Sequence, residues 1–263
     1  MIRVEDLHMH FGGIRAVDGV SIQIPDRSIT GLIGPNGAGK STLFNVIAGL
    51  FKPTSGRVWL AGEEITGLPP HELFHKGLLR TFQIAHEFST LTVRENLMMV
   101  PAEQPGETLW DTWFRRGRVN AREADVRQKA DEVIDFLEIP HVADELAGNL
   151  SGGQKKLLEL GRTMMVDPKI VFLDEVGAGV NRTLLGTIAD AILRLNRERG
   201  YTFCLVEHDM DFIAKLCQDV IVMAEGRLLA HGEPDAVMKN EAVIEAYLGR
   251  GLKNKPRRAK AAP

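Results

Sequence analysis

The sequence predicts an α/β fold with a mainly parallel core sheet, an N-terminal antiparallel β subdomain and a helical subdomain. Three observations predict it. A glycine-rich run joins an apolar strand to a helical pattern, the middle of the chain has helical periodicity, and apolar strands alternate with helices towards the C-terminus. Such alternation favours parallel strands that helices cover on both faces.

The opening part of the chain is mostly β. Residues 20–24 and 28–33 are expected to form short strands, and residues 41–50 the helix that follows the glycine-rich run. After a turn at residues 53–56, residues 57–60 suggest a further strand that ends in a hairpin-like turn.

The middle of the chain predicts a helical subdomain inserted over about residues 84–160. Thr92 begins a capping box, Thr-Val-Arg-Glu, that opens a short helix. Farther along, apolar side chains recur at spacings of four, three and four, which places them in one stripe along a helix: Val126, Ala130, Val133 and Leu137.

The C-terminal half alternates strand and helix. Residues 169–173, 202–206 and 220–223 are continuous apolar runs of the kind found in buried strands. Leucines and isoleucines at helical spacing lie between the first two runs, and Gly200 is expected to end that helix. We expect these elements to form one domain over residues 1–249.

Composition limits the classes of function. At 263 residues the chain can bury a sizeable core, and its net charge of −3 gives it no strong attraction to nucleic acid, so no nucleic-acid partner is expected. Cys204 and Cys217 are expected to be reduced, structural cysteines of a cytoplasmic protein.

We expect no transmembrane or signal segment from the pattern of the sequence. No stretch approaches the roughly 18 apolar residues that cross a bilayer. Any membrane role is therefore expected to come through partners. Residues 250–263 form a basic tail that is expected to be disordered, and weak attraction to anionic lipid is the alternative interpretation.

One run carries a strong chemical signal, because it fits G-x-x-x-x-G-K-[ST]. Its residues are Gly34, Pro35, Asn36, Gly37, Ala38, Gly39, Lys40, Ser41 and Thr42. In this pattern glycines let the backbone curl so that its N–H groups cradle phosphates, Lys40 reaches the β- and γ-phosphates, and the Ser41 hydroxyl binds Mg²⁺. By itself the run predicts an NTPase and no more.

A second run, Leu-Ser-Gly-Gly-Gln at residues 150–154, has two interpretations. Ser151 and Gln154 form a capping box, and leucines of the helix that it would begin follow. A capped helix N-terminus beside two glycines also exposes backbone donors, which suits it to hold a phosphate from outside the chain's own pocket. Both interpretations can be true, and the order of the two runs favours the phosphate role.

Two carboxylates follow an apolar strand. Because side chains alternate along a strand, Asp174 and Glu175 should point in different directions and take different roles. We expect Asp174 to hold Mg²⁺ and Glu175 to orient or deprotonate an attacking water, with a solvated strand end as the alternative. His208 follows the next strand, opens onto the same crevice in a parallel sheet and is a candidate γ-phosphate contact.

With these motifs the chain resembles the ATP-binding subunits of ABC transporters, in family order and up to about residue 248. The resemblance implies that Phe11 stacks on adenine, although a core anchor is the alternative, and that Gln83 senses metal and water as a further Mg²⁺ contact. It also implies that two such subunits sandwich two ATPs, so that Ser151 and Gly153 contact the γ-phosphate bound to the partner subunit.

Within that family the chain looks like the larger ATPase subunit of branched-chain amino-acid importers. The resembling stretches are residues 11–17, 80–83, 91–97, 207–210 and 246–249. This implies two polytopic permease subunits, a second ATPase subunit that is homologous or identical, a solute-binding protein as an indirect partner, and a location on the inner face of the cell membrane. Urea and short-amide importers share much of this pattern. A soluble ABC protein without a transporter is less favoured, because such proteins usually carry two ATPase units or a long coiled coil.

One loop departs from the family pattern. Val176 and Arg182 stand where the family usually has prolines, and the loss of two fixed φ angles is expected to loosen the unliganded loop. A regulatory subunit with little turnover is therefore a third hypothesis. The presence of Glu175 and His208 argues against it.

Overall fold

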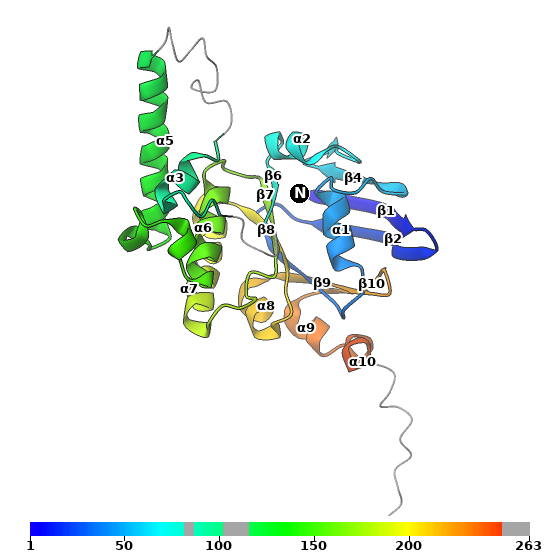
Figure 1. Cartoon of the computed structure of the whole chain (residues 1–263). Helices are drawn as coiled ribbons and strands as arrows, with labels where there is room; N and C mark the ends of the chain where they lie inside the picture. Colours follow the sequence, from blue (N-terminus) through cyan, green and yellow to red (C-terminus); the bar gives the residue numbers. More distant parts are fainter. Residues whose placement is uncertain (82–86, 102–115, 249–263) are drawn as a thin grey trace, which may run out of the picture.

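The computed structural model describes residues 1–81, 87–101 and 116–248, and of residues 116 and 118 it describes the backbone alone. Figure 1 shows two sheets with helix α1 between them, and a group of helices on the far side of the central sheet.

The smaller sheet is antiparallel and has the strand order β2-β1-β4-β5. Its strands are β1 (Ile2–Phe11), β2 (Ile14–Ile24), β4 (Ser55–Leu60) and β5 (Glu63–Glu64). Sequence analysis missed β1, whose pairing with β2 shifts register between Val4 and Leu7. This irregularity, at which Asp6 has φ +44, reverses the alternation of inward-facing residues and so removes the period-2 signal.

The central sheet has the strand order β10-β9-β3-β8-β7-β6. Its strands are β3 (Ile29–Ile33), β6 (Leu78–Arg80), β7 (Ile170–Asp174), β8 (Thr202–Val206), β9 (Asp219–Ala224) and β10 (Arg227–Gly232). Every neighbouring pair is parallel except β9 with β10, which confirms the predicted mainly parallel core. The carboxyl ends of the parallel strands therefore meet at one edge, where a ligand crevice is expected.

The helices follow the predicted order, with extra elements at the C-terminal end. They are α1 (Lys40–Ile47), α2 (Pro70–His75), α3 (Val93–Met98), α5 (Arg116–Phe136), α6 (Gly152–Met164), α7 (Arg182–Arg199), α8 (Met210–Leu216), α9 (Pro234–Met238) and α10 (Glu241–Leu248), with 3₁₀ turns η2 (Pro140–Val142) and η3 (Ala147–Asn149). Both predicted capping boxes form, at Thr92 and Ser151, and Gly200 ends α7 in the left-handed conformation. Strand β10 and helices α9 and α10 were not predicted.

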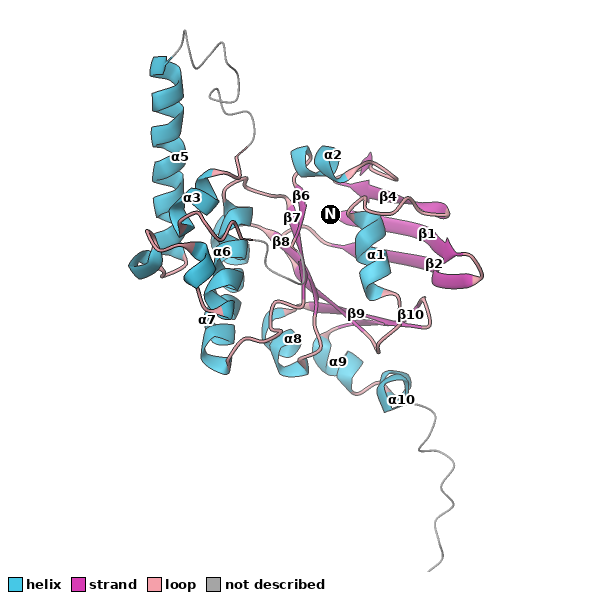
Figure 2. Cartoon of the chain, viewed as in Figure 1, coloured by secondary structure: helices cyan, strands magenta, loops and turns pink. Residues whose placement is uncertain are grey.

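Two hydrophobic cores lie on opposite faces of the central sheet. In β7, Ile170 and Phe172 belong to the core shared with α1 and the small sheet, whereas Val171 and Leu173 belong to the core shared with the helices on the other side. The predicted stripe on α5 is buried in that second core. Figure 2 shows α1 on one side of the central strands and α3, α5, α6 and α7 on the other, so helices cover both faces as predicted.

Candidate active site

The glycine-rich run leaves β3 directly and turns into α1, as the motif requires. Gly34 has φ +151, and a Cβ there would lie 2.2 Å from the carbonyl oxygen of Met223. Gly39 is the N-cap of α1 with φ +96, and a Cβ there would lie 2.3 Å from the carbonyl oxygen of Ala16. Both positions therefore exclude a side chain, and the neighbouring backbone fixes the curl of the loop.

Lys40 is held inside that curl. Its side chain is buried, and Nζ donates to the carbonyl oxygens of Gly34 at 2.7 Å and Pro35 at 3.2 Å. Burial lowers the pKa of the Lys40 ammonium, while the carboxylates of Glu175 and Asp174 oppose that shift. A buried cation held by neutral carbonyls is suited to an anionic ligand, which would offset its lost hydration.

A cavity of about 480 Å³ brings most of the predicted phosphate and catalytic residues together. Its lining includes Asn36, Gly37, Ala38, Gly39, Lys40, Ser41, Thr42, Glu175 and His208. The remaining two members of the run, Gly34 and Pro35, reach the site through Lys40, to which their carbonyls are bonded. One cavity thus combines backbone donors, a cation, a hydroxyl, a carboxylate and an imidazole.

Glu175 is the first residue after β7, and its backbone conformation is strained. Its φ is +50, a conformation that costs a residue with a side chain about 1 kcal/mol, and its N–H donates to the carbonyl of Val206 at 2.9 Å. His208 Nε2 lies 3.2 Å from Glu175 Oε1. A carboxylate and an imidazole at hydrogen-bond distance can act as a general base and the group that orients it.

Asp174 has different surroundings from Glu175, but strand alternation is not the reason, because β7 ends at Asp174 and Glu175 follows it with φ +50. Its side chain is buried, and Oδ2 accepts from Nη2 of Arg80 at 2.8 Å. In the described part of the chain this is the one hydrogen bond that the carboxylate accepts, so Oδ1 is left as an oxygen ligand. Ser41 lines the cavity and Asp174 is not among its lining residues, but both supply oxygen donors of the kind that Mg²⁺ prefers. Gln83, the third predicted Mg²⁺ contact, lies outside the described residues.

Two residues near the cavity were missed as site residues by sequence reasoning. Arg80 was noted as part of a resembling stretch, and nothing in the sequence predicts its ion pair with Asp174. Glu207 is 4% exposed, and its Oε1 accepts the N–H of Gly177 at 2.9 Å. Burial raises the pKa of Glu207, although hydrogen bonds from the backbone of Gly177 and His208 oppose the shift. A charged residue inside a strand end, next to the histidine, was the available signal.

Glu207 ties down the loop that lacks the two prolines. Besides its bond to Gly177, the loop is closed by the N–H of Ala178, which donates to the carbonyl of Glu175 at 3.1 Å, and Val176 is buried. The expected loosening of this loop stays a prediction. These contacts oppose it, because they would have to break for the loop to move.

The Leu-Ser-Gly-Gly-Gln run forms the N-terminus of α6. The Ser151 N–H donates to Gln154 Oε1 at 2.9 Å, and the Ser151 Oγ accepts the Gln154 N–H, which completes the box. Gly153 lies beneath α7, where a Cβ would fall 1.8 Å from Leu184. Ser151 lines a separate cavity of about 410 Å³ that shares no lining residue with the Lys40 cavity. The two phosphate-binding candidates of one chain therefore do not face one ligand.

Phe11 ends β1 and is 43% exposed, which contradicts the alternative of a core anchor. Its ring packs edge-on against Phe51 with a centroid distance of 5.4 Å. One side of the ring is thus supported while much of it stays open, an arrangement that suits stacking on a flat ligand.

A second polar cluster lies in the small sheet, where ligand atoms of His8, His10 and Asp18 lie within 4.8 Å of one another. Asp18 is already paired, since Arg227 Nη2 lies 2.6 Å and Arg15 Nη1 3.6 Å from its Oδ2. Two guanidinium groups oppose the binding of a further cation. We therefore assign this cluster to the packing of the hairpin.

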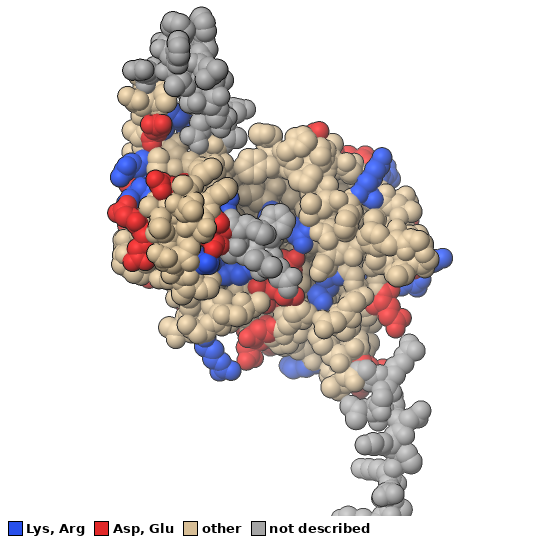
Figure 3. Space-filling model, viewed as in Figure 1, with Lys and Arg blue, Asp and Glu red and all other residues tan. Residues whose placement is uncertain are grey.

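No described helix combines the length and the apolar character needed to cross a bilayer. On the face seen in Figure 3, Lys and Arg side chains are interspersed with Asp and Glu.

Comparison with protein families gives two matches. Residues 17–178 match the ABC transporter model, and residues 227–253 match the model of the branched-chain amino acid ATP-binding cassette transporter. LivG of Archaeoglobus fulgidus, a probable branched-chain amino acid transport ATP-binding protein, is 38% identical over 95% of each chain. BraF of Pseudomonas aeruginosa, a high-affinity branched-chain amino acid transport ATP-binding protein, is 36% identical over 95% of this chain and 98% of its own.

Solved structures give the same result. A nucleotide-free ATP-binding cassette from an ABC transporter is 38% identical, with a TM-score of 0.82 over 95% of this chain and 99% of its own. The ADP conformation of an ATP-binding cassette also has a TM-score of 0.82 and 38% identity, over 95% and 98% of the two chains. Because the ABC transporter model matches more than half of the chain, and relatives share over a third of its residues along almost their whole length, the chain belongs to the ABC transporter family of ATPases.

Proposed function

We propose that this chain is the ATP-binding and ATP-hydrolysing subunit of an ABC importer for branched-chain amino acids. The observation that carries the ATPase part is the single cavity in which Lys40 and the phosphate loop face Glu175 and His208. The branched-chain part rests on the match of residues 227–253 and on the named activities of LivG and BraF. A urea or short-amide importer is the alternative for the solute.

The proposed chemistry is in-line attack of water on the γ-phosphate of ATP. Lys40 and the loop amides bind the β- and γ-phosphates, Glu175 orients or deprotonates the water, and His208 contacts the γ-phosphate. When bound, Mg²⁺ neutralises phosphate charge, and Ser41, Asp174 and Gln83 would hold it. Phe11 would stack on the adenine ring.

The separation of the two phosphate-binding candidates supports a two-subunit ATP sandwich. The N-terminus of α6 is capped by its own side chains, and it presents Ser151 and the glycine backbone away from the Lys40 cavity. We infer that Ser151 and Gly153 contact the γ-phosphate bound to a second ATPase subunit, homologous or identical. Each site would then be complete only in the closed pair.

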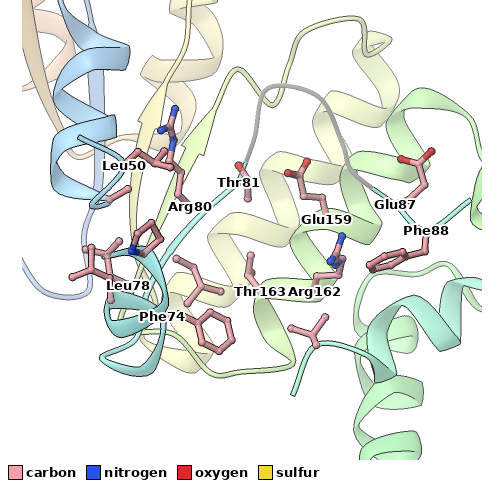
Figure 4. A pocket seen from close by; sticks show the side chains of 15 residues that line it. Leu50, Phe74, Leu78, Arg80, Thr81, Glu87, Phe88, Glu159, Arg162 and Thr163 are labelled. Carbon is pink, nitrogen blue, oxygen red and sulfur yellow. The ribbon is translucent and has the colours of Figure 1, made fainter. Parts of the chain in front are cut away.

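The permease subunits are proposed to dock in a groove of about 630 Å³ between the central-sheet edge and α6. Figure 4 shows Leu50, Phe74 and Leu78 on one wall and Phe88 and Arg162 on the other. A groove lined mainly by apolar side chains, with Arg80, Glu159 and Arg162 among them, is suited to a helix of a partner. We place the chain on the inner face of the membrane through these contacts, with the solute-binding protein as an indirect partner.

The domain limits remain part of the proposal. They are one ATPase domain over residues 1–249, with the helical subdomain at about 84–160, and a basic tail at 250–263. The groove would then lie where that subdomain meets the rest of the domain, so closure between the two parts would be felt by its occupant.

Two experiments test the proposal. Affinity purification of the tagged chain from its native membranes, with and without ATP, is expected to recover two polytopic membrane proteins and a second ATPase. In proteoliposomes, leucine delivered by the co-purified binding protein is expected to stimulate hydrolysis, and Glu175→Gln to abolish it. Stimulation by urea alone would reassign the solute, and recovery of only ribosomal or nucleic-acid partners would refute the transport role.

A further inference from the structure

Arg80 lines the groove and also bonds to Asp174, the carboxylate that we expect to hold Mg²⁺. It is the last residue of β6, the edge strand that pairs in parallel with β7, and its register partner is Phe172. Its side chain is 11% exposed. Figure 4 shows Arg80 beside Leu50 and Leu78 on one wall of the groove, across from Glu159 and Arg162.

The guanidinium of Arg80 joins three elements. Nη2 donates to Asp174 Oδ2 at the end of β7, and Nη1 donates to Asn45 Oδ1 in α1, the helix that the phosphate loop begins. The planar fork of an arginine fixes both directions at once, which a lysine ammonium on its flexible stem does not. The orientation of the Asp174 carboxylate is therefore coupled to β6 and to α1.

This coupling bears on metal binding. Arg80 bonds to Oδ2, and no hydrogen bond to Oδ1 is found among the described residues, so Oδ1 keeps both of its lone pairs for a metal ion. Replacing a residue that hydrogen-bonds to a metal-ligating side chain typically weakens metal affinity by about 10- to 100-fold. The positive charge of Arg80 acts in the opposite sense, because a cation beside a ligand weakens its attraction for Mg²⁺.

We propose that Arg80 is a positioning residue that orients Asp174 for Mg²⁺ and connects this carboxylate to the wall of the groove. The proposal rests on the proposed Mg²⁺ site and permease groove. A partner that displaces the end of β6 would change the direction of Oδ1, and so the affinity for Mg²⁺, without touching the nucleotide.

Arg80→Lys separates orientation from charge, since it keeps the charge and loses the fork. Binding of Mn²⁺, a paramagnetic substitute for Mg²⁺, is measured by electron paramagnetic resonance on the isolated full chain with a non-hydrolysable ATP analogue. We expect about 10- to 100-fold weaker Mn²⁺ binding in Arg80→Lys. Binding of the analogue in EDTA is expected to stay unchanged. Arg162→Lys is the matched control, because Arg162 lines the same groove and its guanidinium lies over Phe88.

Each other outcome overturns the proposal. If Arg80→Lys bound Mn²⁺ as tightly as the native chain, or more tightly, the guanidinium of Arg80 would not be needed to orient Asp174. A matching loss of analogue binding in EDTA would show that Arg80 maintains the structure in general. If the native chain itself bound no Mn²⁺ with the analogue, the proposed Mg²⁺ site would be wrong. That result is distinct from a failure of the Arg80 proposal alone, because it is seen in the native chain before any variant is compared.

Discussion

The phosphate loop, residues 34–42, lines the Lys40 cavity, whereas the loop after Glu175, residues 176–181, lines a neighbouring cavity that shares Glu175 and His208 with it. The two loops are held by different means. The first is shaped by its own glycines and by Lys40, which donates to carbonyls five and six positions back. The second is held through Gly177 by Glu207, 30 positions farther along the chain. The glycines and the lysine that shape the first loop can be recognised in a sequence motif, whereas the distant acceptor that holds the second loop cannot.

The largest expected effect separates binding from hydrolysis. Glu175→Gln removes the group that we place on the attacking water, so the rate of ATP hydrolysis is expected to fall by about 10²- to 10⁴-fold while ATP binding persists. Lys40→Ala, on the other side of the cavity, is expected to weaken ATP binding itself. Steady-state hydrolysis of the assembled complex and equilibrium ATP binding check the pair, and equal loss of binding in both variants would contradict this division.

The close fit of the phosphate loop is tested by two glycines that both have positive φ. Gly39→Ala forces a Cβ against the carbonyl of Ala16 and is expected to cost about 3 kcal/mol and abolish ATP binding. Gly37→Ala meets nothing within 4 Å, so it is expected to cost about 1 kcal/mol, for φ strain alone. Chemical denaturation measures both, and equal costs would mean that the close contact does not matter.

The distant tether is tested by Glu207→Ala, which leaves the Gly177 N–H without its acceptor. We expect a loss of about 1–3 kcal/mol in stability and a lower hydrolysis rate with unchanged ATP binding. Thr202→Val is the control, because it removes the acceptor of the Arg27 N–H at the other end of β8. It should destabilise by a similar amount and leave the hydrolysis rate per folded molecule intact.

Glu207 also gives a pH dependence. Burial raises its pKa in the folded chain above the unfolded value of about 4.3, so the stability linked to this group is complete below that pH and is lost as pH rises through the folded pKa. Glu207→Gln does not titrate. Its stability relative to the native chain is therefore expected to improve as pH rises, and denaturation curves between pH 4 and 8 that run parallel would refute this.

The smallest effect concerns the missing prolines. Arg182 is the first residue of α7, a helix position that tolerates proline. The residue before it, Asn181, has ψ 158, an extended backbone that can precede a proline. Arg182→Pro is expected to stabilise the chain by about 0.4–1 kcal/mol through the unfolded state. Leu185→Pro is the contrast, because its N–H donates to Asn181, and it is expected to destabilise by about 3 kcal/mol. Thermal denaturation distinguishes them.

The sequence by itself determined the elements whose signal is local. The period of the α5 stripe, the two capping boxes, the Gly200 stop and the glycine-rich run each depend on neighbours a few positions away, and each formed as predicted. Strand β1 was missed because its register shift breaks the alternation that a pattern search needs.

Only the tertiary structure decided which side chains meet. Arg80 reaches Asp174 across 94 positions and Glu207 reaches Gly177 across 30, and no spacing in the sequence marks either contact. Parallel pairing at one sheet edge creates these contacts, because it brings strand ends together whatever their distance along the chain. The motifs therefore specify the chemistry of the site, while the sheet specifies what holds its carboxylates in place.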